Sequence, residues 1–242
     1  MSRRGWVLAA LLLVILAAPA AAQKSWDEVV LSPEALGGGL WMVRGVGGNL
    51  LLCTGADGAL LVDAQFSPLG GRIRALADSL GRTVTGASAP PLRFVVNTHY
   101  HDDHVDGDAA MAAAGATIVA HEAVRARVSV TAFNSTFAET ARAIPPAGRP
   151  AITFTDSLTF HLDGHDLRVV HVPPAHTDGD AYVWIPDADV LHTGDLFFNG
   201  DYPVVDVAGG GSLDGLIRSA ARLLVLAGPR TRIVPGHGPL AD

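Results

Sequence analysis

The apolar positions of the chain fall into short runs separated by glycine, proline and polar residues, a pattern typical of an α/β protein. These runs predict strands over 39–44, 49–54, 59–63, 92–97, 117–120, 151–155, 158–162, 166–172, 181–185, 190–192 and 232–234. Segments with apolar residues at helical spacing predict helices over 68–80, 105–114, 121–130 and 212–226. The stretch 131–150 follows neither pattern, and its prolines predict a long connection that serves as a lid or binding loop.

Turn residues fix how some of these strands are joined. Gly47-Gly48 and residues 56–58 connect the first three strands, which therefore form an antiparallel meander. Asp163-Gly164 predicts a hairpin between the strands over 158–162 and 166–172.

The N-terminal segment has the features of a secretory signal peptide over residues 1–22. Arg3 and Arg4 precede an apolar run over 6–18, and small residues at 20–22 form a cleavage site before Gln23. The run is shorter than the ~20 residues that span a bilayer, so we expect cleavage after Ala22 and no membrane attachment afterwards. The mature protein, residues 23–242, is expected in the periplasm or outside the cell.

Composition narrows the choice of partners. The chain has 24 acidic against 17 basic residues and a formal net charge of −7, which argues against nucleic acid as a partner. Lys24 is the only lysine. Cys53, the only cysteine, lies within an apolar run and is predicted to be a core residue. The oligomeric state is left open.

Four potential metal ligands lie close together after the strand predicted over 92–97. They are His99, His101, Asp103 and His104 in the sequence Thr98-His99-Tyr100-His101-Asp102-Asp103-His104. Residues two apart in extended backbone share a side, so His99 and His101 can reach one point while the next two residues turn to a second. Imidazoles and a carboxylate suit Zn²⁺, and less selectively Fe or Mn.

Three more candidate ligands, His176, Asp195 and His237, occupy similar positions later in the chain. Each lies at or after the end of an apolar strand, in a turn rich in glycine or proline. In open α/β sheets ligands bind beyond the carboxyl ends of the strands. We therefore predict that these three side chains meet the first cluster.

The order of these motifs resembles the metallo-β-lactamase superfamily over essentially the whole mature chain. The motifs on which this resemblance rests are His-x-His-x-Asp-His after a strand, a lone His176 in a Pro/Gly turn, Gly194-Asp195 after a strand, and Gly236-His237-Gly238 near the C-terminus. The resemblance implies an αβ/βα four-layer sandwich forming a single hydrolase domain over 23–242. Its first half would run from residue 39 to about 130 and its second from 151 to the end.

The resemblance also implies roles for the ligands. His99, His101 and His176 would hold one Zn²⁺, Asp103, His104 and His237 a second, and Asp195 would bridge both. A hydroxide shared by the two ions would then open a lactam, lactone, ester or thioester bond in a small-molecule substrate, with Asp103 also orienting the hydroxide.

Several other residues are expected to play supporting parts. Asp63 is a candidate partner for a ligand histidine, His121 a helix cap, and His192 a buried support. Asp178 and Asp180 are expected to make orienting hydrogen bonds. The remaining members of this group, expected to be exposed or structural, are His161, His165 and His171.

The substrate is less well defined by the sequence. One β-lactamase branch has a lysine three residues after the position of Asp195, where this chain has Phe198, so that mode of carboxylate binding is in doubt. Apolar walls of the site are expected from Phe197, Phe198, Tyr202, Phe133 and Phe137. Two alternatives remain: an oxidoreductase of the same superfamily with a single iron that oxidises persulfides, and an exported metal-binding protein without catalysis.

Overall fold

The computed structural model describes residues 25–242; the predicted signal peptide over 1–22 lies outside them. The helices are α1 (Gly70–Thr85), α2 (Asp102–Val105), α3 (Asp108–Ala113), α4 (Glu122–Val128) and α5 (Leu213–Leu226), with 3₁₀ turns η1 (Trp26–Glu28), η2 (Ser67–Leu69) and η3 (Pro146–Gly148). The strands of the first half are β1 (Ser32–Gly37), β2 (Leu40–Arg44), β3 (Leu50–Gly55), β4 (Gly58–Val62), β5 (Leu92–Val96) and β6 (Thr117–His121). The remaining strands are β7 (Ala132–Asn134), β8 (Glu139–Ala141), β9 (Ile152–Phe154), β10 (Ser157–Leu162), β11 (His165–His171), β12 (Ala181–Ile185), β13 (Val190–Phe198) and β14 (Arg232–His237).

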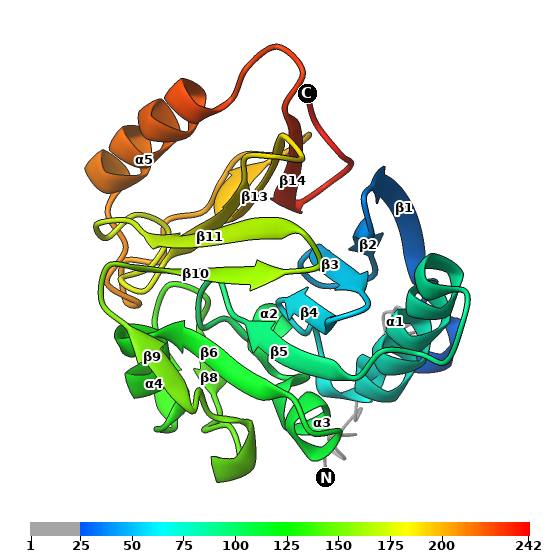
Figure 1. The fold of residues 1–242 in the computed structure, drawn as a ribbon. Helices are drawn as coiled ribbons and strands as arrows, with labels where there is room; N and C mark the ends of the chain where they lie inside the picture. Colours follow the sequence, from blue (N-terminus) through cyan, green and yellow to red (C-terminus); the bar gives the residue numbers. More distant parts are fainter. Residues whose placement is uncertain (1–24) are drawn as a thin grey trace, which may run out of the picture.

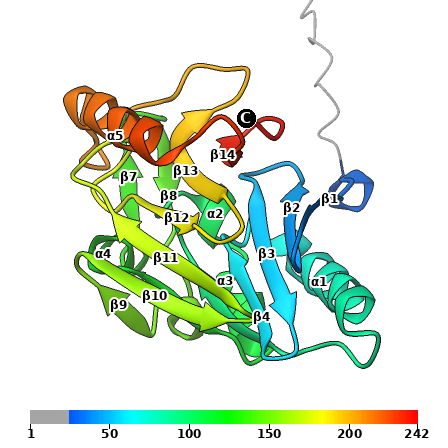
Figure 2. The ribbon, with the colours of Figure 1, turned by 45° about the horizontal axis from the view of Figure 1, so that its top comes forward.

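Two sheets lie face to face with helices on their outer sides (Figure 1). The first has the order β1-β2-β3-β4-β5-β6-β9, and the second β10-β11-β12-β13-β14. Helices α1, α3 and α4 contact strands of the first sheet, and α5 contacts β13 of the second. In the turned view, α5 again lies on the far side of the second sheet from α1 (Figure 2). The structure is therefore the predicted αβ/βα four-layer sandwich.

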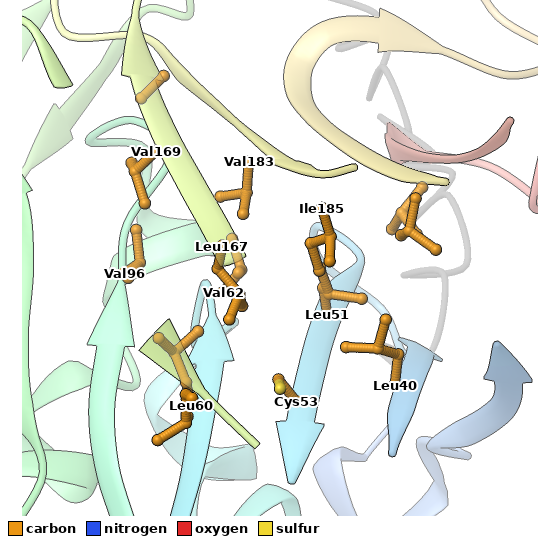
Figure 3. Close-up of a cluster of buried hydrophobic side chains, with 14 of the residues drawn as sticks. Leu40, Leu51, Cys53, Leu60, Val62, Val96, Leu167, Val169, Val183 and Ile185 are labelled. Carbon is orange, nitrogen blue, oxygen red and sulfur yellow. The ribbon is translucent and has the colours of Figure 1, made fainter. Parts of the chain in front are cut away.

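The main core lies between the sheets, and alternation along the strands builds it. In β3, Leu51 and Cys53 face the second sheet while Leu50 and Leu52 face the helices. This strand is buried on both faces because each face is covered. Figure 3 shows Leu51 of the first sheet beside Ile185 of the second, and Val62 of the first beside Leu167 of the second. Cys53 is a core residue, as predicted; burial raises the pKa of its thiol to about 12, with smaller effects of nearby carboxylates.

The helix predicted over 105–114 corresponds to the end of α2 and to the separate helix α3. The strands of the two large sheets differ from the prediction in three features. The strand at 152–154 belongs to the first sheet, where it pairs in parallel with β6, so placing it in the second half was wrong. A parallel pair needs a crossover, and α4 with the segment that follows it supplies one. The edge strand β1 was not predicted, because Pro33 interrupts its pattern; an edge strand tolerates proline.

The third difference concerns the strands that carry two candidate ligands. Strand β13 continues to Phe198 and β14 to His237, beyond the glycines expected to end them. The two strands are paired in parallel with register shifts around Gly194, so the ladder resumes after each irregularity. Asp195 and His237 therefore lie within strands rather than in loops.

The two predicted connections have different outcomes. Asp163 and Gly164, with φ of 54° and 82°, form the hairpin turn between β10 and β11 as predicted. The long connection over 131–150 contains the short antiparallel pair β7–β8.

Among the described residues, no helix combines the length and apolar composition that crossing a bilayer requires.

Candidate metal centre

The turn after β5 delivers the first ligands because its backbone is held by a buried carboxylate. Asp63, at the end of β4, accepts hydrogen bonds from Thr98 N at 2.7 Å and from Thr98 Oγ1 at 2.8 Å. Thr98 O in turn accepts one from Ala181 N at 2.8 Å, which ties this turn to the segment that carries His176. Gly194 allows the close approach, since a Cβ there would lie 2.7 Å from the Thr98 Cβ.

Four of the predicted ligands form one buried group: His99, His101, His176 and Asp195. His101 Nδ1 lies 3.1 Å from His99 Nε2 and 2.9 Å from His176 Nε2. Asp195 Oδ2 lies 3.3 Å from His176 Nε2 and 3.7 Å from His99 Nε2. These four atoms converge on one point from three separate segments.

The other three predicted ligands, Asp103, His104 and His237, form a second group beside the first. Asp103 Oδ2 lies 3.6 Å from His104 Nε2 and 3.3 Å from His237 Nε2. Asp195 reaches this group too, with Oδ1 3.1 Å from His104 Nε2 and Oδ2 3.5 Å from His237 Nε2. Its carboxylate thus lies between the two groups.

These spacings fit divalent cations. Ligands ~2.1 Å from a tetrahedral metal lie ~3.4 Å from one another, and the contacts above range from 2.9 to 3.7 Å. His104 Nε2 and Asp195 Oδ1 are buried and have no hydrogen-bond partner among the described residues. Buried polar atoms without partners are rare, and a cation between them would satisfy both.

Outer hydrogen bonds fix which ring nitrogen of His99, His104 and His176 is free to bind a metal. His104 Nδ1 donates to Asp63 Oδ2 at 2.8 Å and His176 Nδ1 to Val204 O at 2.7 Å. The hydroxyl proton of Thr98 goes to Asp63, so Thr98 Oγ1 accepts from His99 Nδ1 at 3.1 Å. Each leaves Nε2 as the ligand atom. Asp63 makes the hydrogen bond expected of it and supports both groups.

Asp206 is a supporting residue that the sequence did not reveal. It is fully buried, and its Oδ2 accepts from His101 Nε2 at 2.9 Å, from Asn134 Nδ2 at 2.7 Å and from the Tyr100 hydroxyl. Its Oδ1 accepts from Gly209 N at 2.9 Å. The bond to His101 leaves Nδ1 as that ligand atom. The only signal in the sequence was a lone aspartate in an apolar stretch before Gly209-Gly210-Gly211.

The polypeptide by itself places opposed charges at this centre. Burial raises the pKa of Asp195, but His104 and His99 outweigh it and hold that pKa well below its usual range. Burial lowers the pKa of His237, but Asp103 and Asp195 outweigh it and raise it to about 9. Burial, with adjacent imidazoles, also holds the pKa of His99 well below its usual value. An ionised carboxylate buried among imidazoles is the environment a cation would stabilise.

A pocket of about 460 Å³ opens onto both groups. Its apolar lining comes from Phe66, Phe137, Phe198 and Val204, and its acidic lining beyond the candidate ligands from Asp102, Glu139 and Asp201. Burial and the carboxylates of Asp106, Glu139 and Asp103 raise the pKa of Asp102 to about 6. Phe137 and Glu139 come from the β7–β8 segment, so the long connection contributes to the site as expected.

The other predicted aromatic residues lie elsewhere. Phe197 lines a separate apolar cavity under α5, and Phe133 lines a third beside Tyr100. Tyr202 is 90% exposed and lines none of these three cavities. The expected apolar wall is thus made by Phe137 and Phe198 but not by these three residues.

The remaining histidines lie outside the two groups of candidate ligands. His121 caps α4 by accepting from Ala123 N at 3.3 Å, as predicted, and stacks on His171 at 3.7 Å between ring centroids. His192 is buried and accepts from Gly194 N at 3.1 Å. His161 is exposed, and His165 bonds to Gly38 O at 2.7 Å.

The two acidic residues after His176 make the expected hydrogen bonds. Asp180 accepts from Thr177 N at 2.8 Å. Asp178 accepts two hydrogen bonds from Arg127, at 2.7 and 2.6 Å.

Comparison with known proteins adds a family and a fold. The sequence model described as "Metallo-beta-lactamase superfamily" matches residues 43–237. A hydroxyacylglutathione hydrolase from Brucella anthropi is 33% identical over 108 residues, which are 44% of this chain and 34% of that protein. The chain therefore spans about a third of the length of the curated relatives it matches first.

Solved structures share the architecture. A metallo-beta-lactamase from Pontibacter korlensis has a TM-score of 0.68 at 22% identity, over 88% of this chain and 94% of that chain. TTHA1623 in a di-iron-bound form has a TM-score of 0.58 at 28% identity, over 81% of this chain and 89% of that chain. The first of these likenesses shows the fold alone.

Proposed function

The chain belongs to the metallo-β-lactamase superfamily, and we propose from that premise that it is a dinuclear zinc hydrolase that opens a carbonyl bond in a small-molecule substrate. The observation that carries the proposal is the meeting of seven histidine and aspartate side chains in two adjoining groups. The candidate bonds are those of β-lactams, lactones, esters and thioesters.

The residues would share the work as follows. Zinc ions held by the two groups would polarise the carbonyl and acidify a water. His99, His101 and His176 would hold one ion, Asp103, His104 and His237 the other, and Asp195 both. Asp103 lines the pocket and its side chain is 24% exposed, so its carboxylate can also accept a hydrogen bond from the attacking water and orient it.

Walls and rigid supports complete the site. Phe137 and Phe198 line the pocket and would exclude bulk water from the reacting carbonyl. Asp63 would keep His104 in a single orientation, and Asp206 would do the same for His101, because each carboxylate holds the outer ring nitrogen.

The test is turnover by metal-loaded protein of nitrocefin, an acyl homoserine lactone and a glutathione thioester. His101→Ala and Asp103→Ala should each lower kcat/KM by roughly 10²-fold or more while circular dichroism shows an unchanged fold. His161→Ala, at an exposed histidine outside the site, is the matched control. Activity retained in either ligand variant would refute the mechanism.

The identity of the ions is tested separately by metal analysis of protein purified from its native host. Zinc is the proposed ion, and the likeness to a protein solved with two irons keeps iron as the alternative. Iron in the purified protein, with persulfide-dependent oxygen uptake and no hydrolysis, would favour the oxidoreductase instead.

Export and domain organisation are part of the same proposal. Arg3, Arg4, the apolar run over 6–18 and the small residues before Gln23 support removal of residues 1–22 during export to the periplasm or beyond. Ligands from both sheets converge at one centre, which supports a single hydrolase domain over 23–242. N-terminal sequencing of the exported protein should begin at Gln23.

A further inference from the structure

The mouth of the metal pocket is acidic. Three carboxylates line it besides the two candidate ligands Asp103 and Asp195. They are Asp102 at the start of α2, Glu139 in β8 and Asp201 after β13, and all three are exposed. Segments far apart in the sequence thus bring negative charge to the same opening.

Apart from the candidate ligand histidines, the described side chains that line this pocket are apolar or acidic. Among the described residues 25–242, no arginine or lysine lines it. Arg127 lies near the site, but its guanidinium group already donates two hydrogen bonds to Asp178. Its guanidinium carbon also lies 5.1 Å from the centre of the Tyr100 ring. With the candidate ligand histidines holding metal ions, a substrate carboxylate would therefore find no arginine or lysine to pair with among the described residues of the pocket.

Zinc ions would add positive charge at the floor of the pocket and not at its mouth. Their charge lies at the floor of the pocket, where Asp103 and Asp195 offset part of it. A substrate group at the mouth faces the three outer carboxylates. One such carboxylate ~6 Å from a substrate anion weakens binding roughly threefold in water, and more where solvent is excluded.

The remaining lining suits an apolar or cationic group. Phe66, Phe137, Phe198 and Val204 form the apolar part of the wall. Aromatic faces attract cations, quaternary ammonium groups above all, and adjacent carboxylates strengthen that preference.

We propose that this pocket accepts carbonyl substrates whose group distal to the scissile bond is neutral or cationic, and that it discriminates against substrates with a carboxylate there. The inference rests on the hydrolase function proposed above and narrows its substrate class. Neutral lactones should then be better substrates than β-lactams or glutathione thioesters, which carry carboxylates.

The test uses three thioacetates of similar size, whose thiols carry a trimethylammonium group (thiocholine), a tert-butyl group (3,3-dimethylbutanethiol) or a carboxylate (4-mercapto-2,2-dimethylbutanoate). For the zinc-loaded protein we expect kcat/KM for the cationic and neutral esters to exceed that for the anionic ester by roughly tenfold or more. The double variant Glu139→Gln/Asp201→Asn should reduce the cation-to-anion ratio at least roughly threefold. The matched control Glu34→Gln/Asp214→Asn removes the same charge from exposed positions outside the pocket and should leave the ratio unchanged.

A second readout does not depend on turnover. Binding of the three free thiols to cobalt-loaded protein is followed by the thiolate-to-cobalt absorption band. Affinity in the order cation, neutral, anion, lost in Glu139→Gln/Asp201→Asn, supports the inference even if no ester is hydrolysed; in that case only the hydrolase proposal fails. Equal affinities, or a preference for the anionic thiol, overturn the inference even if all three esters are hydrolysed.

Discussion

Replacing Asp206 by asparagine tests whether a buried carboxylate sets the metal-binding nitrogen of His101. The native Oδ2 accepts three hydrogen bonds, from His101 Nε2, Asn134 Nδ2 and the Tyr100 hydroxyl, while Oδ1 accepts from Gly209 N. An asparagine has one oxygen, so its amide group must face either the three donors or Gly209 N. Bonds to a charged acceptor contribute ~1.5–3 kcal/mol each and neutral ones ~0.5–1.5 kcal/mol.

Both orientations of the amide weaken the first ion site. If the amide faces His101, Nε2 must accept the bond and the proton moves to Nδ1, the atom directed at His99 and His176. If the oxygen faces His101, the bond remains but loses its charge. We therefore expect ion affinity at this group to fall roughly 10- to 100-fold, whereas the group of His104 and His237 keeps its affinity within roughly threefold.

The assay is competition with a chromogenic chelator, combined with metal stoichiometry after dialysis. Tyr100→Phe is the matched control, because it removes one donor to the same carboxylate and leaves the bond to His101 in place. The free energy of unfolding should fall in both variants, and ion affinity only in Asp206→Asn. Equal ion affinities in the two variants would show that Asp206 supports the fold and not the ligand.

Three further substitutions test other features of the structure. Asp63→Asn should lower ion affinity at both groups by roughly tenfold or more, since Asp63 holds His104 directly and reaches the other group through a threonine; the same chelator competition measures it. Burial and a stacked imidazole lower the pKa of His171 from its usual 6.5. As the pH drops below 6.5, this histidine therefore takes up its proton in the unfolded chain before it does so in the folded protein, and the free energy of unfolding falls. His171→Gln should reduce the difference between the urea midpoints measured at about pH 7.5 and at about pH 5.5. Gly215→Ala would place a Cβ 1.6 Å from a backbone carbonyl oxygen, whereas Gly71 has open space around it. Thermal unfolding should therefore show a free energy of unfolding lowered by ~1–3 kcal/mol in Gly215→Ala. In Gly71→Ala the same measurement should show it raised by ~0.4–1 kcal/mol.

Sequence reasoning located the candidate ligands because their placement follows from local rules. His99 to His104 are contiguous and follow a strand, and Asp195 and His237 lie on adjacent parallel strands near their carboxyl ends. Carboxyl ends of parallel strands share an edge of the sheet, so proximity follows from topology alone. Their position in space agrees with the prediction, while their role as ligands stays a proposal.

Other features could not be predicted from the sequence because no local sequence pattern encodes them. Asp206 is separated by 105 residues from His101 and by 72 from Asn134, and no spacing rule connects them. Strand β9 has only three residues, too few for a periodic pattern to show which sheet it joins. The net charge of −7 was evident, but the gathering of Glu139 and Asp201 at one pocket was not. Tertiary packing decides each of these.

The position of the centre explains how so many buried polar groups are compatible with a stable fold. The first sheet contributes the turn after β5, and the second contributes Asp195 and His237 from paired strands. Burying Asp195 among imidazoles would normally destabilise the protein, because each charge loses its hydration. Ions that bind only the folded chain reverse this effect, since their binding free energy adds to that of folding. The same cations that would activate a substrate would therefore also hold the edges of the two sheets together, and selection for chemistry and for stability would act on the same seven side chains.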